Sequence, residues 1–170
     1  MKQKSITMLT VSMIVLGMMG VMLLIYVNRA HDEFKESVQV NENGVTEQVL
    51  EVRDLMLNPA DQKQYEVELT CLASGQFDIT LDYDEIENGG MKPFVNVRIF
   101  CEENELYSGT LVDLLDNGRT VVFREALHAT EPLVLYMVYE MPYETGNEAQ
   151  GTFADFNIHL TIEKTESRGE

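Results

Sequence analysis

The stretch YEVELTC, residues 65–71, decides the fold, because its side chains alternate strictly between apolar and polar. Tyr65, Val67, Leu69 and Cys71 share one side of an extended chain, and Glu66, Glu68 and Thr70 share the other. Successive side chains of a strand point to opposite faces, so one face would pack on a core and the other would meet water. The stretch therefore predicts a half-buried β-strand.

The same alternation recurs along the chain. It places apolar residues at 77, 79 and 81, at 95, 97, 99 and 101, and at 156, 158, 160 and 162. The runs TVVF (120–123) and LVLYMVY (133–139) are almost wholly apolar and are expected as interior strands, and LVDLL (111–115) is expected to form a short helical turn. Turn signals separate these segments: NPAD, NGGMKP, DNG and TEP. About seven or eight short strands at this spacing predict an all-β, jelly-roll-like two-layer β-sandwich over residues 45–164.

The N-terminus has a different character. Residues 5–27, SITMLTVSMIVLGMMGVMLLIYV, carry no charge, and as a helix they would span about 35 Å, enough to cross a bilayer. A cleaved signal is the alternative, but its apolar region is usually only about 7–15 residues long and ends at small residues. We therefore expect an uncleaved signal-anchor helix, with residues 1–4 as a cytoplasmic tail.

The remainder is expected outside the cell membrane, as a single-pass protein with an extracellular C-terminal domain. Residues 28–44 are polar and are expected to form a stalk, and residues 165–170 a polar tail. The formal net charge is −17. Such an acidic surface repels nucleic acid, so no nucleic-acid partner is expected.

No pattern in the chain supports catalysis. The three histidines, His31, His128 and His159, are too far apart for an H-E-x-x-H motif, and neither G-x-S-x-G nor a Gly-rich phosphate loop occurs. We therefore expect a protein that is not an enzyme and that holds no cofactor.

One pair of residues is a candidate for a disulfide bridge, and one acidic segment is a candidate for a calcium site. Cys71 and Cys101 occupy inward positions of predicted strands; a disulfide and two buried thiols are both consistent with the sequence. LDYDEIEN places Asp82, Asp84, Glu85 and Glu87 in what is expected to be one loop, and calcium prefers oxygen ligands. The D-x-D-x-D-G-x5-E spacing is absent, so a solvated acidic loop is the favoured interpretation.

A long connection, ETGNEAQG (144–151), precedes the last predicted strand. We expect Gly146 and Gly151 to supply backbone conformations with positive φ, and the Asn147 and Gln150 amides to satisfy peptide groups. The connection would then fix the register of the final strand, which is an architectural role.

Three segments carry a family resemblance. MPYETGNEAQGTFADFNIHLTIEK (141–164) resembles the closing motif of the TasA/camelysin family of Gram-positive surface and biofilm-matrix proteins. LMLNPADQKQYEVEL (55–69) is similar to the family's L-x-P-G-D turn and following strand, with Ala60 where glycine is usual. ELYSGTLVDLL (105–115) is similar to its aromatic-x-G-x-L-x-x-L segment.

The resemblance implies a jelly-roll domain at the cell surface, in a family whose members polymerise by donating an N-terminal strand to the next subunit. Here the polar start favours a tethered accessory, anchor or minor subunit, and SVQV (37–40) is the one short piece suited to augment a neighbour's sheet edge. The expected function is structural, in biofilm-matrix or surface-fibre assembly or adhesion, with a homologous fibre or matrix protein as partner. The alternatives are a calcium- or ligand-binding surface module and a camelysin-type surface peptidase, although the chain has no zinc motif.

Overall fold

The alternating segments form strands in the computed structural model, which describes residues 34–41 and 44–165. Within these ranges nine strands, one short α-helix and two 3-10 turns follow one another. Their bounds are β1 Phe34–Gln39, β2 Val45–Leu55, β3 Gln62–Thr70, β4 Gly75–Asn88, η1 Lys92–Phe94, β5 Asn96–Cys101, β6 Asn104–Thr110, α2 Leu111–Leu115, β7 Val121–Leu127, β8 Leu133–Glu140, η2 Asn147–Ala149 and β9 Ala154–Lys164.

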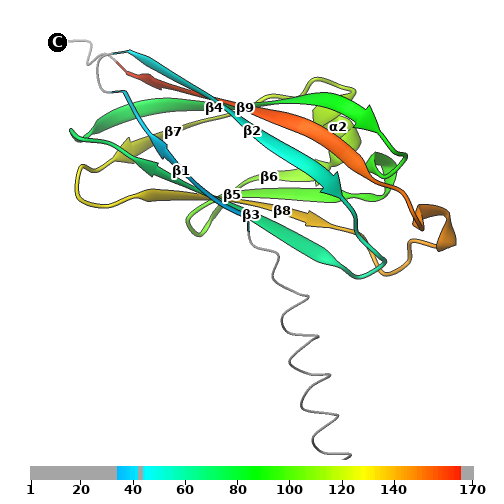
Figure 1. Cartoon of the computed structure of the whole chain (residues 1–170). Helices are drawn as coiled ribbons and strands as arrows, with labels where there is room; N and C mark the ends of the chain where they lie inside the picture. Colours follow the sequence, from blue (N-terminus) through cyan, green and yellow to red (C-terminus); the bar gives the residue numbers. More distant parts are fainter. Residues whose placement is uncertain (1–33, 42–43, 166–170) are drawn as a thin grey trace, which may run out of the picture. The chain divides into compact units, whose positions relative to one another are not determined.

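The strands build two sheets that face each other (Figure 1). One has the order β1-β3-β8-β5-β6 and the other the order β2-β9-β4-β7. Every pair of neighbouring strands is antiparallel except β1 and β3, which are parallel. The described part of the chain is therefore an all-β, two-layer sandwich, as the alternation predicts.

The core lies between the sheets and is built from the inward positions of the alternating strands. In β3, Val67 is 1% exposed and Leu69 is fully buried, while Glu66 and Glu68 keep partial contact with water on the outer face. Burying an aliphatic side chain of this size stabilises the fold by about 1.5–3 kcal/mol. The period of two thus determines which face of each strand is buried.

The two apolar runs have different positions. LVLYMVY forms β8, an interior strand, as predicted. TVVF contributes to β7, which is the edge strand of its sheet, so the prediction of an interior strand is wrong there. Val122 is 64% exposed, because it lies on the outer face of the sheet, opposite to buried Val121.

The predicted helical turn is α2. Thr110 caps it, because its hydroxyl accepts a hydrogen bond from the Asp113 backbone N–H at 3.2 Å. The Asp113 carboxylate accepts in return from the Thr110 N–H at 3.3 Å. This capping box satisfies two backbone donors that a helix start leaves open. Leu111 and Leu114 are fully buried beneath it.

The assignment of residues 28–44 to a stalk needs correction. Phe34–Gln39 forms β1, and Val38 and Val40 are 4% and 3% exposed. The even positions from Phe34 to Val40 face inward, and the polar odd positions face water. SVQV therefore pairs within its own molecule, along β3, in the structure described.

The remaining N-terminal assignments lie outside the described residues: the tail 1–4, the helix 5–27 and the stalk up to residue 33. The tail from residue 166 onward lies outside them as well. Over the ranges 34–41 and 44–165, no helix has the length and apolar character needed to cross a bilayer.

The connection between β8 and β9 carries the chain from one sheet to the other, which explains why a two-residue hairpin turn does not suffice. Gly151 has φ +73°, as predicted, but Gly146 has φ −76° and is extended, so its positive φ is not observed. The Gln150 amide donates to the Asn147 side-chain oxygen at 3.1 Å. Among the hydrogen bonds observed, these amides bind each other rather than peptide groups.

Candidate functional site

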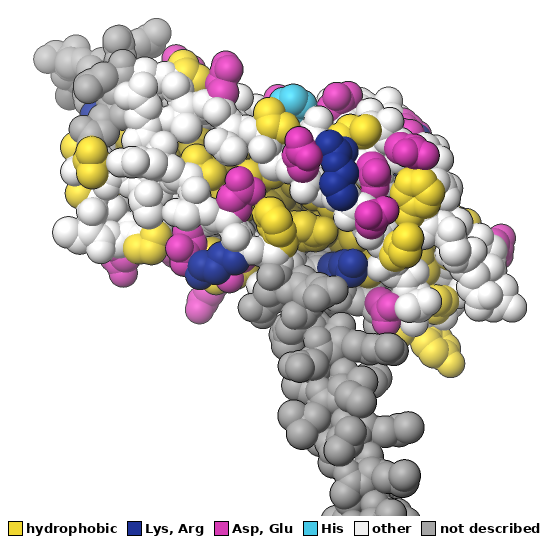
Figure 2. Space-filling model, viewed as in Figure 1, with side chains coloured by type: hydrophobic (Ala, Val, Ile, Leu, Met, Phe, Trp, Pro, Cys, Tyr) yellow, Lys and Arg dark blue, Asp and Glu magenta, His cyan; other side chains and the backbone are white. Residues whose placement is uncertain are grey.

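The two sheets leave a groove open where β1 and β2, each an edge strand, run along the same side of the sandwich. Its volume is about 540 Å³, and it is lined by Phe34, Glu36, Val49, Glu51, Arg53 and Tyr65. We call this the β1/β2 groove. Figure 2 shows hydrophobic side chains in the hollow between the sheets, with basic and acidic side chains around them.

The opposite side of the sandwich is closed differently. There the chain passes from β6 through α2 to β7, and α2 contacts β4, β6 and η1. Leu111 and Leu114 of α2 are fully buried, so the short helix fills the space between the sheet edges. The β1/β2 groove is the side without such a cover among the described residues.

A chain of aromatic rings joins the groove to the core. Phe34 lies 5.4 Å from Tyr65, and Tyr65 lies 5.4 Å from Tyr139 in an edge-to-face arrangement. Tyr139 contacts Phe156 at 5.5 Å, and Phe156 contacts Tyr83 at 5.9 Å. These separations are typical of stabilising aromatic pairs. Phe34 is 43% exposed, so the series begins at the surface and ends at buried rings.

The series includes two buried tyrosines, Tyr83 and Tyr139, whose hydroxyls lie 3.4 Å apart. Burial raises the pKa of both Tyr83 and Tyr139 above the ordinary value of a phenol, because the charged form would lose its hydration. Both groups therefore remain neutral in the folded protein, and their hydroxyls form a polar contact between the two sheets.

On the outer face, two ion pairs join β1 to β3. The Lys35 ammonium lies 2.7 Å from a Glu66 carboxylate oxygen and 2.6 Å from one of Glu68. These hydrogen bonds raise the pKa of Lys35. Lys35 is 55% exposed, so the pairs specify the position of β1 more than they stabilise it.

The predicted calcium residues do not form a loop. Asp82, Asp84, Glu85 and Glu87 all belong to β4, which continues to Asn88 with a bulge between Glu85 and Glu87. Asp82 accepts a hydrogen bond from the Thr120 hydroxyl, and Glu85 pairs with Lys92. No group of three His, Cys, Asp or Glu within the described ranges is arranged to hold a metal ion.

The two cysteines do not form a disulfide in the structure. Cys71 is 5% exposed and Cys101 is 1% exposed. Cys71 follows the end of β3 and Cys101 ends β5, and β8 lies between those strands. Burial raises the pKa of Cys101 to about 12, so its reactive thiolate is suppressed at neutral pH.

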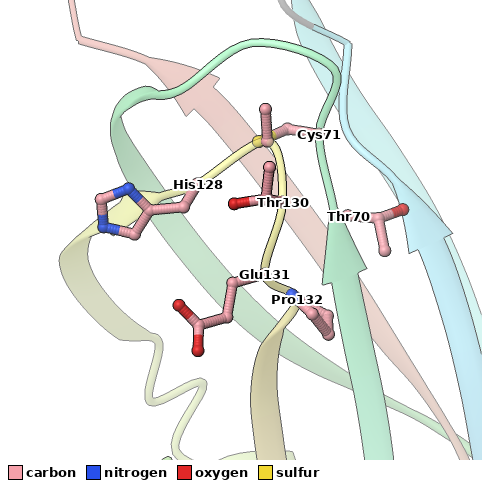
Figure 3. A pocket seen from close by; sticks show the side chains of 7 residues that line it. Thr70, Cys71, His128, Thr130, Glu131 and Pro132 are labelled. Atoms are coloured by element: carbon pink, nitrogen blue, oxygen red, sulfur yellow. The ribbon is translucent and has the colours of Figure 1, made fainter.

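A smaller pocket of about 150 Å³ lies beside Cys71, at the turn between β7 and β8. Its lining is Thr70, Cys71, His128, Ala129, Thr130, Glu131 and Pro132. Figure 3 shows the His128 and Glu131 side chains directed away from Cys71. The three groups therefore do not converge on one point, as a catalytic or metal site would require.

Comparison with known proteins assigns no family to the chain. No family model and no curated protein matches the chain. The pre-peptidase C-terminal domain of a Bacillus anthracis collagenase is 14% identical, covering 78% of this chain and 98% of its own, with a TM-score of 0.34. PliG of Aeromonas hydrophila, a periplasmic inhibitor of g-type lysozyme, is 10% identical, covering 77% and 99%, with a TM-score of 0.35.

The CUB1-EGF-CUB2 domains of rat MASP-1 are 10% identical over 79% of this chain and 45% of that one, with a TM-score of 0.42. With scores at this level, the neighbours assign neither a family nor a function to the chain.

The candidate residues that the sequence predicts do not line the β1/β2 groove. The groove residues Phe34 and Glu36 lie in the segment expected to be a stalk, whereas Tyr65 was expected on a strand. One sequence pattern does indicate a strand there: the alternate positions Phe34, Val38 and Val40 are apolar. A single inward acid, Glu36, interrupts that pattern.

Proposed function

We propose that this protein is a membrane-tethered, extracellular β-sandwich with a structural role in biofilm-matrix or surface-fibre assembly or adhesion. In this role it binds by adding an extended segment of a homologous protein to an open sheet edge. No catalytic step is assigned to it.

The main support for this proposal is the open β1/β2 groove. Two edge strands border it, and such strands present unpaired backbone N–H and C=O groups to an incoming strand. The Phe34 and Tyr65 rings offer apolar contact, and Val49, on the outer face of β2, adds to it at the rim of the groove. Main-chain pairing would supply affinity, and these side chains would supply selectivity.

Strand order supports a jelly-roll interpretation. Strands β2 to β9 are divided between the two sheets. One sheet has the order β2-β9-β4-β7, and the other has the order β3-β8-β5-β6. Eight antiparallel strands in two such sheets correspond to the double Greek key of jelly rolls. In this interpretation β1 is an addition to the edge of the eight-stranded body.

Backbone geometry supports the TasA/camelysin resemblance at two of its motifs. Ala60, at the position where the family has glycine, has φ +71°. That left-handed conformation costs residues with a Cβ about 1–2 kcal/mol, so a family preference for glycine there has a physical reason. At the second motif, a Cβ on Gly109 would lie 2.3 Å from the Tyr107 hydroxyl oxygen, so any other residue would have to displace the Tyr107 side chain.

The proposal is tested by mixing the full chain in detergent with a fibre-forming protein of the TasA/camelysin family and measuring association by sedimentation. We expect association, and we expect Val49→Lys to weaken it, since lysine on an edge strand disfavours strand addition. Tyr143→Lys is the matched control, because Tyr143 is 80% exposed in the β8–β9 connection. Equal binding by the two variants would argue against the groove.

The tether and the location are tested on whole cells. We expect protease added outside to remove the sandwich domain while a fragment containing residues 5–27 stays in the membrane. A domain that resists protease on intact cells, yet is degraded after lysis, would contradict an extracellular position.

A further inference from the structure

The sheet β2-β9-β4-β7 has two free edges, and both carry exposed valines. Val45 and Val49 on β2 are 46% and 44% exposed, and Val122 on β7 is 64% exposed. Edge strands of soluble proteins usually carry charges that discourage pairing with other chains. On these two edges the exposed valines alternate with charges, Glu47 and Glu51 on β2 and Arg124 on β7, so pairing would depend on a partner whose charges are complementary.

The directions of the strands allow one copy to follow another. β2 is antiparallel to β9, β9 to β4, and β4 to β7, so β2 and β7 run in opposite directions. A second copy placed beside the first in the same orientation would therefore present its β2 antiparallel to β7. Such a contact is heterologous and can repeat without closing.

We propose that β7 of one molecule pairs with β2 of a second copy, with Val122 opposite Val49 and Arg124 opposite Glu47. On the same outer face, this register joins apolar to apolar and base to acid. Directly opposed pairs of these kinds stabilise strand pairing. Further along, Ala126 would face Val45, which is also an apolar pair.

The inner face fits the same register. Val121 of β7, 6% exposed, would lie opposite Leu50 of β2, 3% exposed, so the apolar layer between the sheets would continue across the boundary. A two-residue slip in either direction keeps the faces aligned but places Val122 opposite Glu47 or Glu51. It also places Arg124 opposite a valine. The two edges therefore specify one register.

Electrostatics is compatible with this arrangement. Arg124 donates to both carboxylate oxygens of Asp78 on β4, at 2.6 and 2.9 Å, and is 60% exposed. Its outer side is thus accessible to a second carboxylate, Glu47 of the next copy. The net charge of −17 opposes self-association over long distances, but at about 0.15 M salt that repulsion is screened beyond about 8 Å.

This inference rests on the proposed function, because it fills the free edge of β2 that borders the β1/β2 groove. It adds the identity of the partner, a second copy of this chain, and the strand that the partner supplies. One strand pair is a small interface, so the contact is expected to be weak and is best trapped covalently.

The experiment uses the full chain in lipid vesicles and a bifunctional thiol reagent that bridges about 5 Å, the Cβ separation of opposed residues. Val49→Cys and Val122→Cys are tested alone, mixed, and combined in one chain. Both positions are exposed and the native cysteines are buried, so the introduced thiols react selectively. Val122→Cys mixed with Glu51→Cys reports the register, and Val122→Cys mixed with Tyr143→Cys reports random collision.

We expect a cross-linked dimer from the Val49→Cys and Val122→Cys mixture, a ladder from the double variant, and at most background from either variant alone. The two control mixtures should give at least tenfold less dimer. Equal cross-linking in the control mixtures, or none in the double variant, would overturn the inference. Binding to a fibre-forming homologue is measured separately, so an absent ladder with retained homologue binding refutes only the inference.

Discussion

Replacing Ala60 by glycine should stabilise the protein. Ala60 has φ +71° in the NPAD turn between β2 and β3, and its N–H donates to the Met141 carbonyl at 2.9 Å. The turn is fixed further by the Asp61 carboxylate, which accepts from the Asn58 N–H at 2.9 Å. Because these bonds hold the turn in place, the backbone cannot relax away from the left-handed conformation.

The expected gain follows from two opposing terms. A left-handed conformation costs a residue with a Cβ about 1–2 kcal/mol, which glycine avoids. Glycine loses about 0.5–1 kcal/mol more backbone entropy on folding. The net effect should be a stabilisation of about 0.5–1 kcal/mol, or a rise in Tm of about 2–5 °C for a domain of this size.

Thermal and urea unfolding monitored by circular dichroism measure the effect. Ala129→Gly is the matched control, because Ala129 is exposed and has no positive φ. The control should lose about 0.5–1 kcal/mol, since only the entropy term applies. A loss of stability in Ala60→Gly equal to that of the control would refute the left-handed turn.

Three further predictions concern the core and its supports. Gly109→Ala should destabilise the domain by about 1–3 kcal/mol, because the new methyl meets the Tyr107 hydroxyl; unchanged urea unfolding would contradict this. Lys92→Ala should cost about 1 kcal/mol, because the Lys92 side chain is 14% exposed and its removal takes away the ion-pair partner of Glu85 and Asp116; urea unfolding identical to that of the unmodified protein would contradict this. Tyr83 and Tyr139 should ionise only on unfolding, so tyrosinate absorbance should show a late cooperative step. Because burial raises the pKa of each tyrosine, the stability that comes from keeping the two phenols neutral is intact below about pH 10 and falls as pH rises above it. Early, gradual ionisation of all tyrosines would be inconsistent with the burial of these two.

The sequence is sufficient to predict the sandwich because alternation is a local property. β9 shows it throughout and β3 shows it from Tyr65 onward, and their inward residues are buried as expected except Tyr65, which is half-buried. The short helix α2 is likewise local, since Thr110 and Asp113 form its cap at a fixed spacing. These elements need no information about distant parts of the chain.

The failures arise where a distant partner decides the outcome. β1 looks like a polar stalk because Glu36 interrupts its inward face, and only pairing with β3 makes it a strand. The acids after Leu81 suggest a loop, but β4 continues because β9 pairs with it as far as Asn88. The groove joins Phe34 to Val49 and Tyr65 across two sheets, which no local pattern encodes.

Hydrogen–deuterium exchange of the full chain, alone and bound to a fibre-forming homologue, tests the open sheet edge most directly. We expect binding to slow exchange in Val45–Leu55, because an added strand would pair the free backbone groups of β2. Slowed exchange confined to Leu133–Glu140, at the centre of the other sheet, with β2 unchanged, would contradict the proposed site.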